Sequence, residues 1–242
     1  MGQLDGKIAV VTGGGTGIGF AIAERFAGEG AQVVLVGRRM ERLDTAAQQI
    51  GNGAYGISAD MGDEAQTRGL FERLERVDIL ATLAGTTHFG TIEESAPADV
   101  RELFDGRFFG QLFCCHFAVP KMPEGSQILL CSGTAAEAHL PRYAAGTALC
   151  SAVNALGEHM AVALGSKGIR VNVLSPGFIV PTAAEINLNP EETATVLGGA
   201  VQTIPMGRIG APSEVAEAAL FLVTSSYVNG QVVRVDGGWG AT

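Results

Sequence analysis

Hydrophobic runs alternate with amphipathic stretches along most of the chain, and this pattern predicts alternating strands and helices. The apolar runs predict strands at Ile8–Val11, Gln32–Val36, Ala54–Ala59, Asp78–Leu83, Gln127–Cys131, Ile169–Leu174 and Gln231–Val235. Helical spacing is found at Ile18–Glu29, Arg38–Ile50, Glu64–Arg76, Pro97–Val119, Gly146–Ser166 and Ser213–Val223. Such alternation predicts one α/β domain over residues 1–242, with a doubly wound parallel sheet, helices on both faces and a ligand site at the carboxyl ends of the strands.

The segment Phe178–Gly210 departs from this pattern, because three prolines interrupt it and its helical pieces look short. A long insertion after a strand end is usually functional, so we expect a lid over a substrate at about residues 178–210. Its apolar residues favour an apolar ligand, although ordinary packing explains them nearly as well: Phe178, Ile179, Ile186, Leu188 and Leu197.

A glycine-rich turn, Thr12–Gly19, lies where the first strand must become the first helix. Glycine adopts positive φ without strain and lets another group approach the backbone. The start of the helix offers N–H groups and the positive end of its dipole, which suit a pyrophosphate. A tight turn alone would also use glycines, but the βαβ context favours a dinucleotide site made by Gly13, Gly15, Thr16, Gly17, Ile18 and Gly19.

Composition narrows the class of protein. The chain has 242 residues, of which 47% are hydrophobic and 17% charged, and its net charge is −9. The negative charge argues against nucleic acid as a partner, and no apolar run approaches the ~20 residues of a membrane span. The four cysteines lack metal-ligand spacing. We therefore expect a cytoplasmic protein with no metal site, no membrane contact and no nucleic-acid partner.

Several segments, which follow one another in the same order as in the family, resemble the short-chain dehydrogenase/reductase family over essentially the whole chain. They are the turn Thr12–Gly19, Asp60 after the third strand, Ala84-Gly85 after the fourth, Ile169–Gly177, Gly207–Pro212 and Val235–Gly238. The resemblance implies a Rossmann-type fold, a nicotinamide cofactor and oxidoreductase activity.

The choice of cofactor follows from the end of the second strand. Family members that bind NAD have an acid there, whereas this chain has Gly37 followed by Arg38 and Arg39. A guanidinium pairs with a 2′-phosphate, so we expect NADP(H). The resemblance places Asp60 and Met61 beside the adenine and Pro176, Gly177 and Ile179 beside the nicotinamide, with Ala84, Gly85 and Thr182 as further cofactor contacts.

The catalytic positions of the family are only partly retained. The family uses Ser, Tyr and Lys, with an Asn that supports a water relay. Ser132 matches the Ser, but counting back from Ile169 places Gly146 at the Tyr position and Cys150 at the Lys position, and Arg107 stands at the Asn position. A rival register uses Tyr143, but its fourth residue onward is Thr147, and the helix would then be about three residues too long.

Two functions follow from these departures. In the first, the protein is an NADPH-dependent ketoreductase whose aromatic substrate protonates its own alkoxide through a neighbouring phenol; the loss of a general acid costs typically ~10²–10⁴-fold. The pattern resembles the atypical ketoreductases of angucyclinone polyketides, which lack the Tyr and act in antibiotic biosynthesis. In the second, the protein is an inactive pseudoenzyme that binds NADP(H) as a sensor or assembly subunit.

Four residues are candidates for the catalytic work: Ser132, Tyr143, His139 and Arg107. Ser132 can orient a carbonyl or simply cap its strand, and Tyr143 and His139, like His88, can donate a proton if their loops fold inward. Arg107 can fill the vacated relay space or pair with Asp105 or Glu102, since a buried charge needs a partner.

The helix Val100–Val119 is apolar around much of its circumference, with five phenylalanines. Such a helix suits burial on two sides, and the family commonly forms tetramers through its long helices. We therefore expect a homotetramer or a homodimer, although a wide core-facing stripe would look similar.

Overall fold

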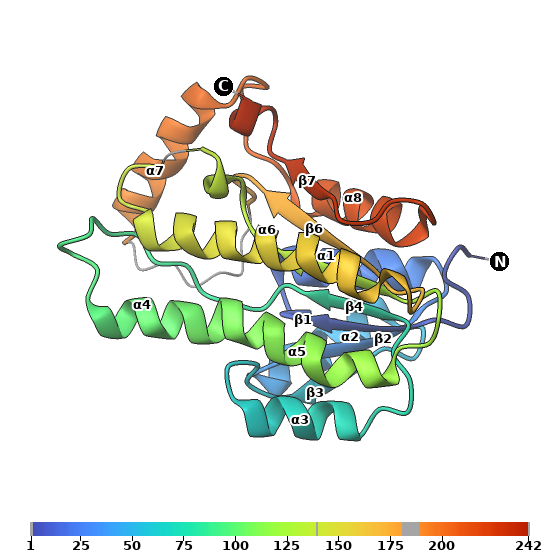
Figure 1. Ribbon diagram of the computed structural model, residues 1–242. Coiled ribbons are helices and arrows are strands. Elements are labelled where there is room, and N and C mark those ends of the chain that lie inside the picture. Colours follow the sequence, from blue (N-terminus) through green and yellow to red (C-terminus); the bar gives the residue numbers. More distant parts are fainter. Residues whose placement is uncertain (1, 139, 181–188, 242) are drawn as a thin grey trace.

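The computed structural model describes residues 2–138, 140–180 and 189–241. Its centre is a seven-stranded parallel sheet with the strand order β3-β2-β1-β4-β5-β6-β7 (Figure 1). The strands are β1 Ile8–Thr12, β2 Gln32–Gly37, β3 Tyr55–Ser58, β4 Ile79–Thr82, β5 Gln127–Cys131, β6 Arg170–Pro176 and β7 Val232–Val235. The prediction of a doubly wound parallel sheet is confirmed, and the order reverses between β1 and β4, where such sheets bind their ligands.

Helices cover both faces of the sheet. They are α1 Gly17–Gly28, α2 Met40–Ile50, α3 Glu64–Glu72, α4 Pro97–Phe104, α5 Gly110–Ala118, α6 Ala144–Gly165, α7 Pro190–Thr203 and α8 Pro212–Thr224. Side chains of α1, α2 and α8 form one buried cluster against the sheet, and side chains of α3, α5 and α6 form another. Burial on both faces explains why β1, β2, β4 and β5 are nearly continuous hydrophobic runs.

Two elements differ from their sequence-based prediction. The predicted helix over Pro97–Val119 is continuous, but a π-helical turn, Asp105–Phe109, separates α4 from α5. Single π turns occur frequently at functional sites. The prediction of only short helical pieces in 178–210 is wrong, because α7 has 14 residues; Asn189 and Glu192 form a capping box at its start.

The buried carboxylate of Asp78 joins the starts of β1 and β4. It accepts hydrogen bonds from the backbone N–H of Ile8 at 3.0 Å and from Arg76, whose Nη2 lies 2.6 Å from Oδ1. Burial alone would raise the pKa of Asp78, but the bonds from Arg76 and Ile8 outweigh it and the pKa is lowered. The charged form therefore stabilises the folded state above the ordinary carboxyl pKa, and this contribution is lost as pH falls through the lowered value.

Replacement of Asp78 by asparagine is expected to lower the free energy of unfolding by about 1–3 kcal/mol at pH 7. The loss arises because the charged acceptor for Ile8 N–H and Arg76 disappears. Urea unfolding at pH 7 and at pH 3 measures it, and the difference between the variant and the wild type should shrink at the lower pH. An equal difference at both values would contradict the assigned role of the charge.

Candidate active site

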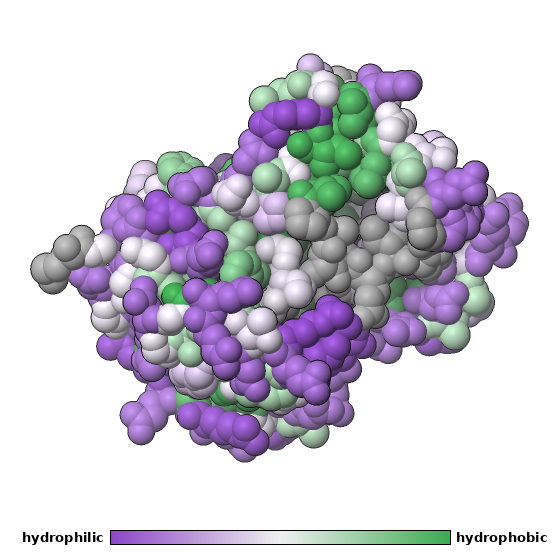
Figure 2. Space-filling view, turned by 180° about the vertical axis from the view of Figure 1, so that it is seen from behind, coloured by the Kyte–Doolittle hydropathy of each residue, from purple (hydrophilic) through white to green (hydrophobic). Residues whose placement is uncertain are grey.

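A cleft of about 1110 Å³ opens at the carboxyl ends of β1, β4 and β5. It begins at the glycine-rich turn and ends beneath α7, where Val196, Leu197 and Trp239 line it. Figure 2 shows hydrophobic residues gathered at the top of the molecule, in the part where α7 lies. The cleft therefore has two parts: a polar part at the glycine-rich turn, which has room for a nucleotide, and an apolar part beneath α7.

The glycine-rich turn is shaped for a close approach. Gly13 has a φ of +68°, and a methyl group at Gly19 would lie 2.3 Å from the carbonyl oxygen of Gly13. Helix α1 begins without a side-chain cap at Thr16, so its first N–H groups face the cleft unsatisfied by a side chain. The turn and helix start thus fit a pyrophosphate, as the sequence predicts.

The end of β2 presents two arginines to the same cleft. Arg38 and Arg39 line it and are exposed, and no carboxylate stands at Gly37. This arrangement suits a phosphate on the ribose better than a bare ribose.

Most of the predicted site residues meet in the cleft. Those that line it are Gly13, Gly15, Thr16, Ile18, Gly19, Arg38, Arg39, Asp60, Met61, Ala84, Gly85, Pro176, Gly177 and Ile179, with Ser132, Tyr143 and Arg107. Gly17 does not line it; it has a φ of +58° at the first position of α1 and so shapes the turn. Thr182 and His139 lie outside the described residues, and His88 does not line the cleft; its Nε2 is buried and has no hydrogen-bond partner.

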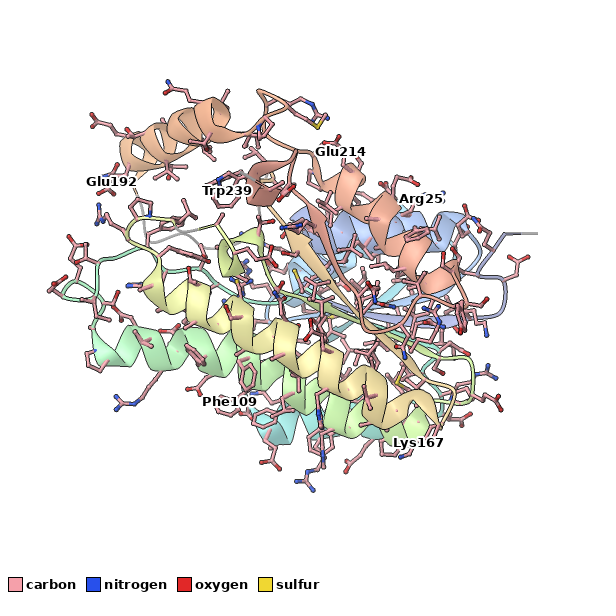
Figure 3. The ribbon with its side chains drawn as sticks, turned by 45° about the horizontal axis from the view of Figure 1, so that its top comes forward. Arg25, Phe109, Lys167, Glu192, Glu214 and Trp239 are labelled. Atoms are coloured by element: carbon pink, nitrogen blue, oxygen red, sulfur yellow. The ribbon has the colours of Figure 1, made fainter. Side chains whose placement is uncertain are left out.

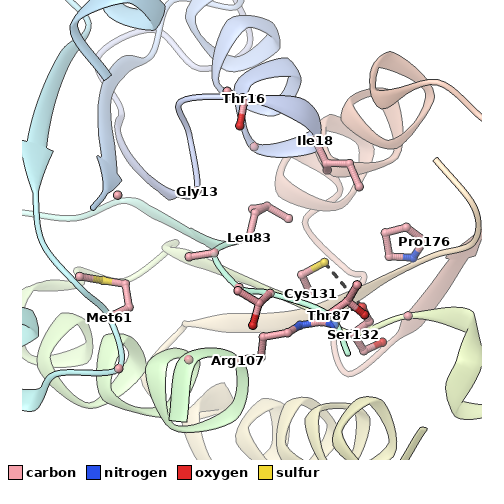
Figure 4. Close-up of a pocket in the computed structure, with 18 of the residues that line it drawn as sticks. Gly13, Thr16, Ile18, Met61, Leu83, Thr87, Arg107, Cys131, Ser132 and Pro176 are labelled. Carbon is pink, nitrogen blue, oxygen red and sulfur yellow. Dashed lines mark hydrogen bonds between the residues drawn. The ribbon is translucent and has the colours of Figure 1, made fainter. Parts of the chain in front are cut away.

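Arg107 reaches the centre of the cleft from the π turn. Its Nη2 donates a hydrogen bond to the carbonyl oxygen of Ser132 at 3.2 Å. Figure 4 shows its side chain directed toward Ser132 and Thr87. Of the two alternatives for Arg107, pairing with Asp105 or Glu102 is not observed: among the described residues no ion pair includes Arg107.

The backbone around Arg107 is fitted to its side chain. The buried amide of Gln111 donates to the carbonyl oxygens of Arg107 at 2.7 Å and of Cys131 at 3.0 Å, which fixes the π turn against the end of β5. A methyl group at Gly85 would lie 2.1 Å from Cγ of Arg107. The aliphatic part of the Arg107 side chain therefore occupies space that is free only because residue 85 is a glycine.

The charge of Arg107 is retained. Burial lowers the pKa of the guanidinium, but the nearby hydroxyl of Tyr143 and thiols of Cys150 and Cys131 outweigh burial, and the pKa is raised. Burial raises the pKa of Cys131 to about 11, with the charge of Arg107 acting in the opposite direction. At neutral pH the centre of the cleft therefore holds a cation beside neutral thiols.

Tyr143 fills the space above Gly146. A methyl group at Gly146 would lie 2.2 Å from Cζ of the Tyr143 ring, so the glycine makes room for this ring. The phenol oxygen lies 2.6 Å from Oγ1 of Thr87, and the ring packs on Phe89 with centroids 4.8 Å apart. Tyr143 is the N-cap residue of α6, which begins at Ala144, two residues before the predicted start at Gly146.

Ser132 lies at the end of β5 and is buried. Its hydroxyl has one long contact, 3.5 Å to the carbonyl oxygen of Leu174, which is too long for a strong hydrogen bond. The hydroxyl therefore retains the capacity to bond a carbonyl placed in the cleft.

Some residues that line the cleft are not among the site residues predicted from the sequence. Thr87 is one, and no motif marks it, because only the fold of the loop after β4 brings it to Tyr143. Trp239 is another: it packs on Phe178 with centroids 4.9 Å apart and closes the apolar end beneath α7 (Figure 3). It is the one tryptophan of the chain, which gave only a weak indication of a binding site.

No group of three or more potential metal ligands occurs within 2–138, 140–180 and 189–241. Across those same ranges, no helix is both long and apolar enough to cross a membrane.

Comparison with known proteins gives consistent matches. Residues 13–240 match the family model described as enoyl-(acyl carrier protein) reductase. Galactitol 2-dehydrogenase of Cereibacter sphaeroides is 36% identical over 98% of this chain and 96% of its own. Versicolorin reductase 1 of Aspergillus parasiticus is 34% identical over 98% of this chain and 97% of its own.

A solved structure described as a short chain dehydrogenase/reductase family protein superimposes with a TM-score of 0.89, at 34% identity over 99% of this chain and 100% of its own. A short-chain type dehydrogenase/reductase from Mycobacterium ulcerans gives the same TM-score at 28% identity, covering 98% of this chain and 91% of its own. The chain therefore belongs to the short-chain dehydrogenase/reductase family of oxidoreductases, which use a nicotinamide cofactor and act on alcohols and ketones.

Proposed function

We propose that the protein reduces a ketone of an aromatic polyketide of the angucyclinone type, in antibiotic or other secondary-metabolite biosynthesis, with NADPH as reductant. The observation that carries the proposal is a single cleft in which a glycine-rich turn that fits a pyrophosphate is joined to an apolar part lined by Leu197 and Trp239. The count back from Ile169, which assigns Gly146 to the family's acid position, supports a reaction without the usual Tyr. The reductive direction is supported by the relative from Aspergillus parasiticus, which is named versicolorin reductase 1. The apolar part of the cleft, with Phe178, Leu197 and Trp239, suits a flat aromatic ligand.

The residues present fit the proposed cofactor. The start of α1 would hold the pyrophosphate, Arg38 and Arg39 the 2′-phosphate, and Pro176 and Gly177 the nicotinamide end. When bound, the nicotinamide supplies a hydride to the carbonyl carbon. Ser132 would then orient the carbonyl oxygen, and the apolar walls would exclude water.

The proton for the resulting alkoxide is proposed to come from the substrate. A phenol beside the ketone forms an internal hydrogen bond to the carbonyl oxygen. As the carbonyl π electrons move onto oxygen, the phenol proton transfers to it, which leaves a secondary alcohol and a phenolate. This path needs no protein acid, consistent with Gly146 and Cys150 at the family's acid-base positions.

The first test is titration with NADPH and NADH by nicotinamide fluorescence, followed by addition of 8-hydroxy-1-tetralone while the reduced-nicotinamide absorbance is recorded. Tight binding of NADPH with ketone-dependent oxidation is expected. Binding without turnover across a panel of aromatic ketones would contradict the proposal and favour the inactive NADP(H)-binding pseudoenzyme.

Replacement of Gly37 by aspartate is expected to reverse the cofactor preference. The carboxylate accepts hydrogen bonds from both ribose hydroxyls of NAD(H) and repels a 2′-phosphate near Arg38. Each like-charge contact costs a few kcal/mol at most, so NADPH affinity should fall by about 10–100-fold. Dissociation constants for both nucleotides measure the change; unchanged preference would place the discriminating contact elsewhere.

Replacement of Tyr143 by phenylalanine is expected to change the rate of ketone reduction by less than about 10-fold, because its hydroxyl bonds Thr87 and the substrate carries its own proton. Single-turnover oxidation of NADPH measures the rate, with Tyr227→Phe as a matched control on an exposed tyrosine. A loss of ~10²–10⁴-fold, the contribution of a general acid, would make Tyr143 the proton donor.

We also propose a homotetramer or homodimer that buries the long helices α5 and α6. Phe109 is 40% exposed and stacks on Phe113, and Val162 on α6 is 83% exposed. Figure 3 shows Phe109 on the side of the molecule away from α7. Light scattering of the wild type and of Phe109→Asp tests the proposal, and a monomeric wild type would contradict it.

A further inference from the structure

Within residues 2–138, 140–180 and 189–241, Arg107 in the wall of the cleft has no carboxylate partner. Arg107 is partly buried, and its Nη2 donates a hydrogen bond to a neutral acceptor, the carbonyl oxygen of Ser132. Buried guanidinium groups ordinarily pair with carboxylates, since an uncompensated charge in a protein wall is costly. A ligand with an anionic group would supply the counter-charge that the described residues lack.

The groups that face Arg107 are two thiols and a phenol. They come from two elements: Cys131 at the end of β5, and Tyr143 and Cys150 at the start and on the second turn of α6. Burial keeps both thiols protonated by raising their pKa values. Arg101, Glu102 and Asp105 line the same cleft from α4 and the π turn, but are exposed at its rim.

The cation is also held in place. Gln111 fixes the backbone of the π turn, and the bare face of Gly85 accommodates the stem of the side chain. The guanidinium of Arg107 lies beside Ser132 in the wall of the cleft (Figure 4). A preorganised cation at this place stabilises negative charge without the reorganisation that water would need.

We infer that Arg107 is the anion-binding residue of this cleft and that it takes the oxyanion of the ligand, a phenolate or enolate conjugated with the ketone. An arginine cannot act as the acid, because its guanidinium does not release a proton near neutral pH. It instead stabilises the oxygen from which a proton has left. The inference rests on the proposed function for the identity of the ligand, and it restricts the substrate to ketones that carry an ionisable hydroxyl.

The direct test is the acidity of a bound phenol in the absence of nucleotide. The absorbance of 8-hydroxy-1-tetralone, which changes when its phenol ionises, is titrated with pH in the presence of excess protein. In the wild type the pKa of the bound phenol should fall by about 1–3 units, as an opposite charge at contact distance produces. In Arg107→Met the shift should vanish, and in Arg107→Lys part of it should remain.

Arg101→Met is the matched control, because it removes an exposed cation from the rim of the same cleft. It should keep the full shift. Thermal unfolding of each variant checks that the fold is retained, and the lysine variant keeps the test valid if the methionine variant is unstable. Equal phenol pKa values in the wild type and Arg107→Met, or no binding of the phenol to the wild type, would overturn the inference.

Turnover separates this inference from the proposed function. With NADPH and the hydroxyketone, Arg107→Met should lower kcat by ~10²–10³-fold with a smaller change in KM and none in NADPH affinity. A lowered phenol pKa without any ketone reduction would retain the anion site and reject the proposed reductase. Ketone reduction that is equally fast in Arg107→Met would retain the reductase and reject the anion site.

Discussion

Replacement of Gly19 by alanine is expected to weaken nicotinamide cofactor binding by more than ~100-fold, because the added methyl group would lie 2.3 Å from the carbonyl oxygen of Gly13. The turn must open to relieve this contact, and the N–H groups at the start of α1 then lose their alignment with the pyrophosphate. Nucleotide titration by fluorescence measures the effect.

Gly28→Ala provides the matched control, because Gly28 ends the same helix and a methyl group there meets nothing within 4 Å. This variant should bind nucleotide as the wild type does. Similar affinities of Gly19→Ala and Gly28→Ala would show that the turn Thr12–Gly19 does not hold the cofactor.

Replacement of Gly85 by alanine is expected to lower the turnover of the hydroxyketone by ~10²-fold or more. A methyl group there would lie 2.1 Å from Cγ of Arg107, so the guanidinium must leave its position against Ser132. Gly85 also has a φ of +152°, which a side chain rarely adopts, so the backbone contributes to the loss. Single-turnover kinetics with saturating NADPH isolates the effect on the chemical step.

A double-mutant cycle separates the two causes. In Arg107→Ala the stem of the side chain is gone, so adding Gly85→Ala should cost much less than it does in the wild type. Additive losses in the two backgrounds would show that Gly85 acts through the backbone or the cofactor and not through Arg107.

The sequence predicts the scaffold well because local patterns encode it. The strands β1, β2, β4 and β5 are apolar runs that are buried on both faces of the sheet. Asp63 caps α3 by accepting from the N–H groups of Ala65 and Gln66. The length of α7 was also readable in principle, since Asn189 and Glu192 have the spacing of a capping box. Three nearby prolines obscured that signal.

The centre of the site could not be predicted in the same way. Spacing predicts that Gly146 and Cys150 stand at the family's Tyr and Lys positions, but it does not predict which side chains occupy the space around them. Tyr143 lies over Gly146, and Arg107 reaches the same place from a π turn fixed by Gln111. These residues meet only through tertiary packing of the π turn, β5 and α6, which no local pattern records.

The most direct measurement compares 8-hydroxy-1-tetralone with 8-methoxy-1-tetralone as substrates, each at saturation with NADPH. The two ketones have nearly the same shape, and only the first carries an internal proton donor. If the substrate supplies the proton, the hydroxyketone should be reduced ~10²–10⁴-fold faster than its methyl ether, the usual contribution of general acid catalysis. Equal rates for the two ketones would contradict the account and require a proton donor in the protein.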